Sequence, residues 1–124
     1  MNIALWVVQV LLALVFLAVG TLKATQPILR LSMRITWTKD VPTPLVRFIG
    51  VAEILGALGL ILPALTGIQP WLTVAAAVGL ATVQASALVF HLLRGEARVI
   101  VGNIVLLVLL LFVVYGRLVL APLA

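Results

Sequence analysis

The chain has 124 residues, of which 65% are hydrophobic and 9% are charged, and its mean hydropathy is +1.39. A soluble domain is nearer half apolar and a quarter charged, so this composition argues against an ordinary soluble protein and indicates one membrane domain over residues 1–124. The formal charge is +5 and there is no cysteine, which excludes disulfides, thiol catalysis and Cys-ligated zinc or iron–sulfur sites.

The first apolar segment covers residues 3–23. About twenty apolar residues are enough to cross the ~30 Å hydrocarbon core of a bilayer. A secretory signal peptide is the alternative interpretation. Because the start of the chain lacks Lys and Arg and the apolar run is longer than a signal-peptide core, we expect a retained span.

Residues 24–44 interrupt the hydropathy and hold several prolines, which break helices. Between the prolines, Ile28, Leu31 and Ile35 are spaced so that they share one face of a helix. Arg30 and Arg34 are spaced so that they share another face. This pattern predicts a short interfacial helix lying on the lipid headgroups. An ordinary basic loop is the alternative.

Three further apolar segments follow, over residues 45–62, 71–93 and 99–117. The connections between them, 64–70 and 94–98, are short, and short connections make antiparallel neighbours. We therefore predict an all-α membrane protein, an antiparallel bundle of four transmembrane helices with a short interfacial segment between the first and second. The second span is expected to end at Pro63.

Basic residues predict the orientation of this bundle. Four spans place loops 24–44 and 94–98 on the same side of the membrane. Seven of the eight basic residues lie in or beside these loops: Lys23, Arg30, Arg34, Lys39, Arg47, Arg94 and Arg98. Only Arg117 falls on the other side. Because cytoplasmic loops carry the excess of Lys and Arg, loops 24–44 and 94–98 are predicted to be cytoplasmic and both termini external, in a prokaryotic-type inner membrane. Since these charges lie between spans, we expect no nucleic-acid partner.

Aromatic residues fit the same orientation. Trp and Tyr concentrate at membrane interfaces. The expected external markers are Trp6, Trp71 and Tyr115, and Trp37 is the expected cytoplasmic one.

Glu53 is the most informative residue of the second span. It lies about 13 Å along a helix from Pro44, near the middle of the hydrocarbon core. A charged group at that depth is costly and normally faces the bundle interior beside a partner. Such an acid either fixes helix register or performs a function, and both interpretations stay open at this stage.

Polar residues on the other spans also fall on common helix faces. Gln9, Phe16 and Lys23 recur every seven residues, and Gln84 and His91 are seven apart. Together they predict an intramembrane polar cluster and candidate ligand site: Lys23, Glu53, Gln84, His91 and Asn103. The expected helix-packing residues are Gly50, Gly56 and Gly59, since small residues let helices approach closely. For Lys23, an outward path to the headgroups is the alternative to inward pairing.

Metal and haem sites receive little support from this residue set. The chain has one histidine and no cysteine, so a zinc site would need several carboxylates and we expect none. Haem held by two His ligands from one chain is impossible, although His91 paired across an oligomer stays open.

At this point the chain resembles the DoxX/DoxX-like family of small four-span membrane proteins. The resemblance rests on Gly20-Thr-Leu-Lys23, on the run from Arg47 to Pro63, on Phe90-His91 and on Asn103. By resemblance, Lys23, Glu53, His91 and Asn103 occupy the family's characteristic polar positions. Related members are linked to sulfur-compound oxidation, quinone reduction and membrane redox complexes. The resemblance implies a fold more than an activity.

Three functions fit these observations. The first is a quinone- or lipid-binding accessory component of a membrane redox complex, with quinone as ligand, no intrinsic cofactor, and electrons supplied by a partner. The second is a structural or chaperone-like assembly module acting through its glycine faces. The third is a small-solute or proton-coupled transporter, which would need a homo-oligomer. No nucleophile elbow, phosphate loop or HExxH motif is present, but acid–base chemistry by Glu53 and His91 on a lipid-soluble substrate stays an alternative.

Overall fold

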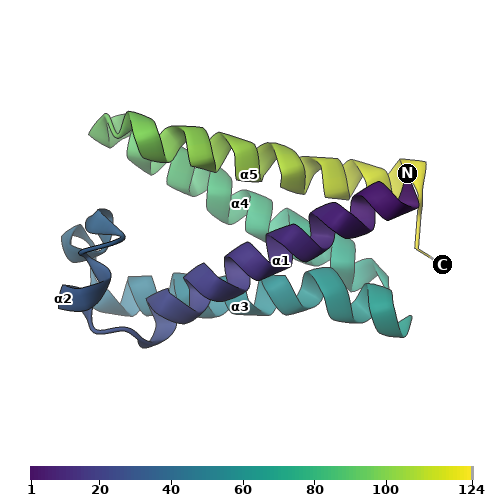
Figure 1. Ribbon diagram of the computed structural model, residues 1–124, viewed down its shortest axis with the longest axis horizontal. Coiled ribbons are helices and arrows are strands. Elements are labelled where there is room, and N and C mark those ends of the chain that lie inside the picture. The colour runs from purple at the N-terminus through teal and green to yellow at the C-terminus, as the bar shows by residue number, and fades with distance from the viewer. Residues whose placement is uncertain (124) are drawn as a thin grey trace.

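The computed structural model describes residues 1–123 and consists of four long helices in two antiparallel pairs (Figure 1). The long helices are α1 (Asn2–Thr25), α3 (Thr43–Thr66), α4 (Trp71–Arg94) and α5 (Ala97–Tyr115), the last extended by the π-helical turn η2 (Gly116–Leu120). All four are long and apolar enough to cross a membrane. This confirms the predicted all-α bundle of four spans.

The two ends of the bundle differ. Residues 26–42 and the turn between α4 and α5 lie at one end, which we call the basic end. Both termini and the turn between α3 and α4 lie at the other, which we call the terminal end (Figure 1). The four helices therefore alternate in direction, as the short connections predict.

The ends of α3 and α4 follow the local sequence. Gly67 and Gly95 adopt the left-handed conformation with φ of 74° and 69°, which glycine tolerates without strain, and they terminate α3 and α4. The expected end of α3 at Pro63 was too early. Pro63 lies in the last turn, where its missing N–H removes only one bond, and the helix continues until Gly67 donates to the Pro63 carbonyl at 3.0 Å.

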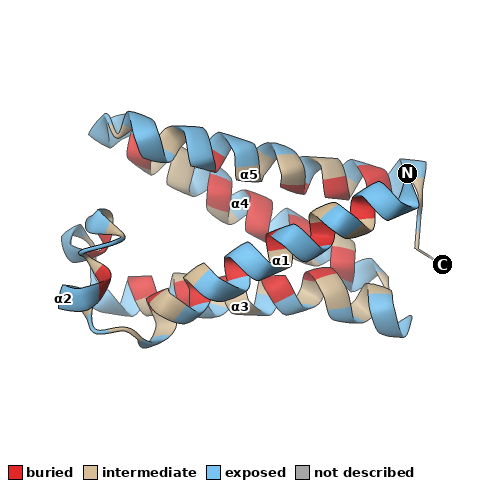
Figure 2. Cartoon of the chain, in the orientation of Figure 1, coloured by how far each residue is buried: buried red, intermediate tan, exposed pale blue. Residues whose placement is uncertain are grey.

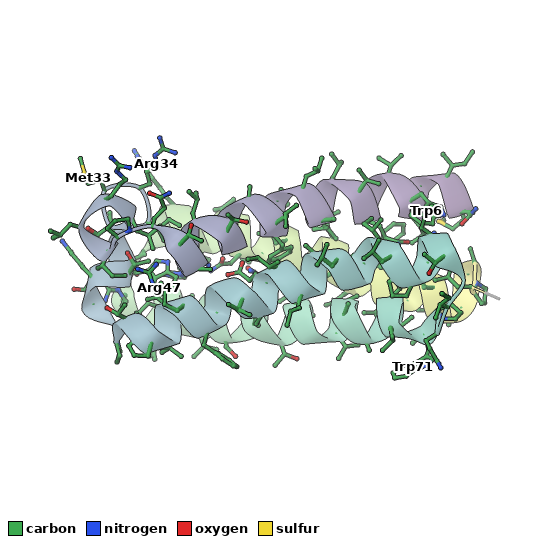
Figure 3. The ribbon with its side chains drawn as sticks, turned by 90° about the horizontal axis from the view of Figure 1, so that it is seen from below. Trp6, Met33, Arg34, Arg47 and Trp71 are labelled. Carbon is green, nitrogen blue, oxygen red and sulfur yellow. The ribbon has the colours of Figure 1, made fainter. Side chains whose placement is uncertain are left out.

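The segment between α1 and α3 is less helical than expected. It holds a single turn, α2 (Ile28–Leu31), and a 3-10 turn, η1 (Thr36–Asp40). Leu31 and Thr38 are buried against the bundle, whereas Met33 and Arg34 point away from it (Figure 3). We call residues 26–42 the cap, since they fold back over the basic end.

Buried residues recur along all four long helices (Figure 2). The apolar core lies where the two pairs cross and is made of Leu12, Phe16, Ala57, Leu60, Ala77, Leu80, Ala81, Leu110 and Val113. Large apolar residues cover the outside, among them Leu55, Val101 and Val108. An apolar exterior around an inward polar face is what a lipid-embedded bundle requires.

Glycines set the closest helix contacts. A Cβ on Gly50 would lie 2.7 Å from the Gly20 carbonyl oxygen and 2.6 Å from the amide nitrogen of Ala24, so α1 and α3 touch through their backbones here. Gly56 and Gly59 make room between α3 and α4 for the side chains of Leu80 and Ala76. All three glycines expected to pack helices therefore lie at helix contacts.

Candidate functional site

The centre of the basic end is a buried ion pair between α1 and α3. Lys23 Nζ lies 2.7 Å from Glu53 Oε1, and the side chains are 11% and 1% exposed. Side chains tilt toward the N-terminus of their helix, so in this antiparallel pair Lys23 reaches inward while Glu53 leans toward the basic end. Lys23 and Glu53 lie three residues to either side of the Gly20–Gly50 contact, so their backbones are about 9 Å apart along the helix axes. The two side chains together span this distance. Lys23 therefore pairs inward.

Two further residues contact Lys23, one at its backbone and one at its ammonium head. Arg47 points into the bundle (Figure 3) and donates to the carbonyl oxygen of Lys23 at 2.9 Å. A cation there satisfies an open carbonyl in the last turn of α1. The ring of Trp37, from the cap, has its centroid 5.2 Å from Lys23 Nζ, within cation–π range. The ammonium is thus enclosed by a carboxylate and an indole.

A chain of polar contacts ties the cap to the turn between α4 and α5. Arg94 donates to Asp40 Oδ2 at 2.6 Å and to Glu96 Oε1 at 2.7 Å. His91 Nδ1 lies 2.9 Å from the same Glu96 oxygen. The hydrogen bond from His91, aided by Arg94, holds the pKa of Glu96 below its usual range. The cap is therefore held across the basic end by charge-assisted hydrogen bonds.

Aromatic rings form the second connection between the cap and α4. Trp37 contacts Phe90 and His91 edge to face, with centroids 5.9 and 6.1 Å apart, and Phe90 and His91 are themselves 5.2 Å apart. Such edge-to-face pairs are favourable beyond their burial. Trp37, expected only as an interface marker, is thus part of the site.

A cavity of about 650 Å³ lies between the two helix pairs at the basic end. The pairs diverge toward this end and leave the cap to bridge them (Figure 1). The volume is within the range of small-molecule sites, and most lining residues are apolar. All five candidate residues line it: Lys23, Glu53, Gln84, His91 and Asn103.

The five candidates differ in their partners. Lys23 and Glu53 pair with each other, and His91 pairs with Glu96. In residues 1–123 no hydrogen bond or ion pair joins His91 to Glu53, although both line the cavity. Gln84 and Asn103 are buried in its wall, and Gln84 Oε1 and Asn103 Nδ2 make no hydrogen bond within the described chain.

Sequence reasoning missed Asp40, Glu96 and Trp37 as parts of this site. All three belong to connections that were read as loops or interface markers. Their roles depend on the cap folding back over α4, and the spacing within residues 24–44 carries no signal for that. Phe90 was noted only through its place beside His91.

A second buried polar cluster lies at the terminal end. Gln9 donates to the Leu60 carbonyl at 2.7 Å and accepts from Arg117 Nε at 2.7 Å. Arg117 also donates to Asn2 Oδ1 at 2.6 Å, and its guanidinium carbon lies 5.6 Å from the Trp6 ring centroid. The sequence marked Arg117 only as the one basic residue on its side. In the structure it joins both ends of the chain to α3.

Within residues 1–123 no group of three or more His, Cys, Asp or Glu side chains is positioned to hold a metal ion. The chemistry that the arrangement offers is hydrogen bonding, charge pairing and proton exchange at Glu53, His91 and Glu96.

Comparison with known proteins gives the family but no close relative. No curated protein and no solved structure matches the chain. The model of the DoxX-like family matches residues 7–113, a range that contains all five candidate residues. With most of its length covered, from α1 to the last turns of α5, this four-span membrane protein belongs to the DoxX-like family.

Proposed function

We propose that this protein binds the head group of a quinone-type lipid and serves as an accessory component of a membrane redox complex. The observation that carries the proposal is the cavity of about 650 Å³ lined by Lys23, Glu53, Gln84, His91 and Asn103. An apolar cavity with a few convergent polar groups is the usual form of a small-molecule site.

The distribution of polar groups suits an amphipathic ligand. Apolar residues from both helix pairs, such as Val15, Ile49 and Leu106, line the cavity and offer a surface to a hydrocarbon tail. The ion pair and the imidazole offer hydrogen bonds to oxygen atoms of a ring. A lipid-soluble ring with a tail satisfies both parts of the cavity at once.

Proton exchange completes the proposed role. Glu96 lies in the turn at the surface of the basic end, His91 contacts it, and His91 lines the cavity. This arrangement offers a route for protons between the aqueous phase and a bound ring. Reduction of a quinone needs two electrons as well as two protons, and in this proposal the electrons come from a redox cofactor of the partner.

The proposed location is the inner membrane of a prokaryotic-type cell, with the basic end cytoplasmic. The absence of cysteine makes a direct test simple, since a single introduced cysteine is the only reactive thiol. Met33 and Ile68 are exposed at opposite ends. We expect a membrane-impermeant maleimide to label M33C only from the cytoplasmic side and I68C only from outside. The reverse pattern contradicts the orientation.

Ligand binding is tested by thermal unfolding of the purified full chain in mild detergent. A benzoquinone with a decyl tail should raise the Tm of the wild type, because a ligand that binds only the folded state stabilises it by mass action. E53Q should lose most of this rise, whereas Y115F, at the terminal end, should keep it. No Tm rise and no co-purified lipid quinone would reject the proposal.

A structural assembly role is the second candidate. Gly79 and Gly102 lie on the outer surface of α4 and α5, and a Cβ on either would meet nothing within 4 Å. Exposed glycines inside a membrane span permit close approach of a partner helix. This role predicts that G79L or G102L abolishes co-purification of a membrane partner while E53Q does not.

A further inference from the structure

The polar wall of the cavity opposite the ion pair is made of two amides without partners. Gln84 on α4 is 5% exposed and Asn103 on α5 is 9% exposed, and both line the cavity. In the described chain neither Gln84 Oε1 nor Asn103 Nδ2 has a hydrogen-bond partner. Buried polar groups are nearly always hydrogen-bonded, so two unpaired amides beside one cavity point to a ligand.

The hydroxyl groups at the mouth of the cavity act as acceptors. Thr82 donates its proton to the Val78 carbonyl at 2.9 Å, and Ser86 donates to the Thr82 carbonyl at 2.9 Å. Both residues line the cavity. Because a hydroxyl has one proton and two lone pairs, each oxygen is left with acceptor capacity only.

The ion pair offers donors as well as acceptors to the cavity. One ammonium proton of Lys23 is used on Glu53 Oε1 at 2.7 Å, and the lysine head also faces the Trp37 ring. An ionised carboxylate accepts hydrogen bonds at two oxygens and donates none. The orphaned atoms of the opposite wall are one acceptor, Gln84 Oε1, and one donor, Asn103 Nδ2.

We propose that this cavity selects a ring hydroxyl, so that the preferred ligand is the hydroquinone form and the oxidised quinone binds more weakly. The inference rests on the proposed function and names the form of its ligand. A quinone carbonyl only accepts, so it can serve the Asn103 N–H but leaves Gln84 Oε1 without a donor. A ring hydroxyl accepts from one amide N–H and donates to an amide oxygen at the same time.

Gln84 and Asn103 are the specificity-determining residues in this proposal. Each amide offers a donor and an acceptor whichever way it is turned, so the selection does not depend on its orientation. A site built to hydrogen-bond a hydroxyl rejects an analogue without it, because its own polar groups are then left unpaired.

The test compares three ligands of nearly equal shape on the full chain in detergent: 2-decyl-1,4-hydroquinone, the corresponding benzoquinone and the hydroquinone dimethyl ether. In a W6F/W71F background, Trp37 is the remaining tryptophan and reports binding from the cavity wall by fluorescence quenching. We expect the hydroquinone Kd to be about tenfold lower than that of the quinone, as one additional matched hydrogen bond implies. The dimethyl ether should bind no better than the quinone.

Nearly isosteric apolar variants assign the selection to the amides. Q84M and N103L, measured singly so that a folding defect in one leaves the other informative, should each reduce the hydroquinone preference to about twofold or less while changing the quinone Kd by less than about threefold. T66V, outside the cavity, should keep the tenfold preference.

The binding results distinguish a failure of the hydroxyl selection from a failure of the proposed quinone-type site. Equal Kd values for hydroquinone and quinone in the wild type, or a preference that survives both Q84M and N103L, overturn the hydroxyl selection and leave the proposed quinone-type site intact. Failure of all three ligands to bind overturns the selection and the proposed function together.

Discussion

Replacing Lys23 with methionine should destabilise the protein more than removing the whole ion pair. Met keeps the length and packing of the lysine stem but leaves the Glu53 carboxyl, 1% exposed, without the ammonium that lies 2.7 Å from it. Removing one partner of a buried pair costs about 3–5 kcal/mol, because the other charge stays buried and unpaired. The Lys23 side chain is 11% exposed and admits some water, so we expect the lower limit, about 3 kcal/mol.

The reciprocal change should cost less. In E53M the lysine loses its carboxylate, but its long stem can carry the ammonium toward the basic end, so we expect a loss of about 1.5 kcal/mol. The double variant K23M/E53M places two flexible apolar side chains together and should lie within about 1 kcal/mol of the wild type. The coupling energy between the two sites is then between about 3.5 and 5.5 kcal/mol.

Reversible unfolding of the wild type, the two single variants and the double variant in mixed detergent micelles measures this coupling energy. K39M, on the exposed side of the cap, is the matched control and should change the free energy of unfolding by less than about 0.5 kcal/mol. Additive effects of K23M and E53M, with no coupling, would show that the pair does not exist in the membrane-embedded protein and would refute the inward assignment of Lys23.

Three further predictions concern packing, pH and the terminal end. G50A should lower the free energy of unfolding by about 1–3 kcal/mol, because its Cβ meets the backbone of α1, whereas G79A, which meets nothing within 4 Å, should be neutral or slightly stabilising by denaturant titration. The contacts of Glu96 with His91 and Arg94 depend on its carboxylate, whose pKa in the folded protein is held below the ordinary 4.5. That stabilisation is fully present above the ordinary value and is lost as pH falls through the lowered one, so the Tm of the wild type should fall over this range and that of E96Q should fall less. R117K should destabilise nearly as much as R117M, since one ammonium cannot reproduce the fork that binds Gln9 and Asn2; full rescue of the Tm by R117K would contradict this.

The four-helix bundle was predictable because it depends on features of each segment by itself, namely its length and the spacing of its polar and small residues. Span lengths follow from the thickness of the bilayer, and the inward face of each helix follows from polar and small residues at helical spacing. Gln9, Phe16 and Lys23 were placed on one stripe, and all three are buried. The same logic brought Glu53 inward and gave it a partner on the neighbouring helix.

The cap was not predictable in the same way. Its single helical turn holds four residues, too few to be stable alone, so its conformation is set by what it packs against. Trp37 lies in the site through contacts with Phe90 and His91, and Asp40 bonds Arg94 across 54 positions of the chain. The expected helix over Ile28 to Ile35 stops at Leu31, which is buried, whereas Met33 and Arg34 are exposed.

The position of the cavity follows from unequal packing along the helices. At the terminal end, Gln9 and Arg117 connect α1, α3 and the turn after α5, and the apolar core lies on the same side of the ion pair. At the basic end the two helix pairs separate, and the connections between them run through the cap, by Asp40 to Arg94 and by Trp37 to Phe90. Gln84 and Asn103 line the cavity at this end and keep unpaired groups there. The helix pairs stay joined at the terminal end. Opening the cavity at the basic end therefore requires breaking the contacts of the cap with α4, namely Asp40 with Arg94 and Trp37 with Phe90.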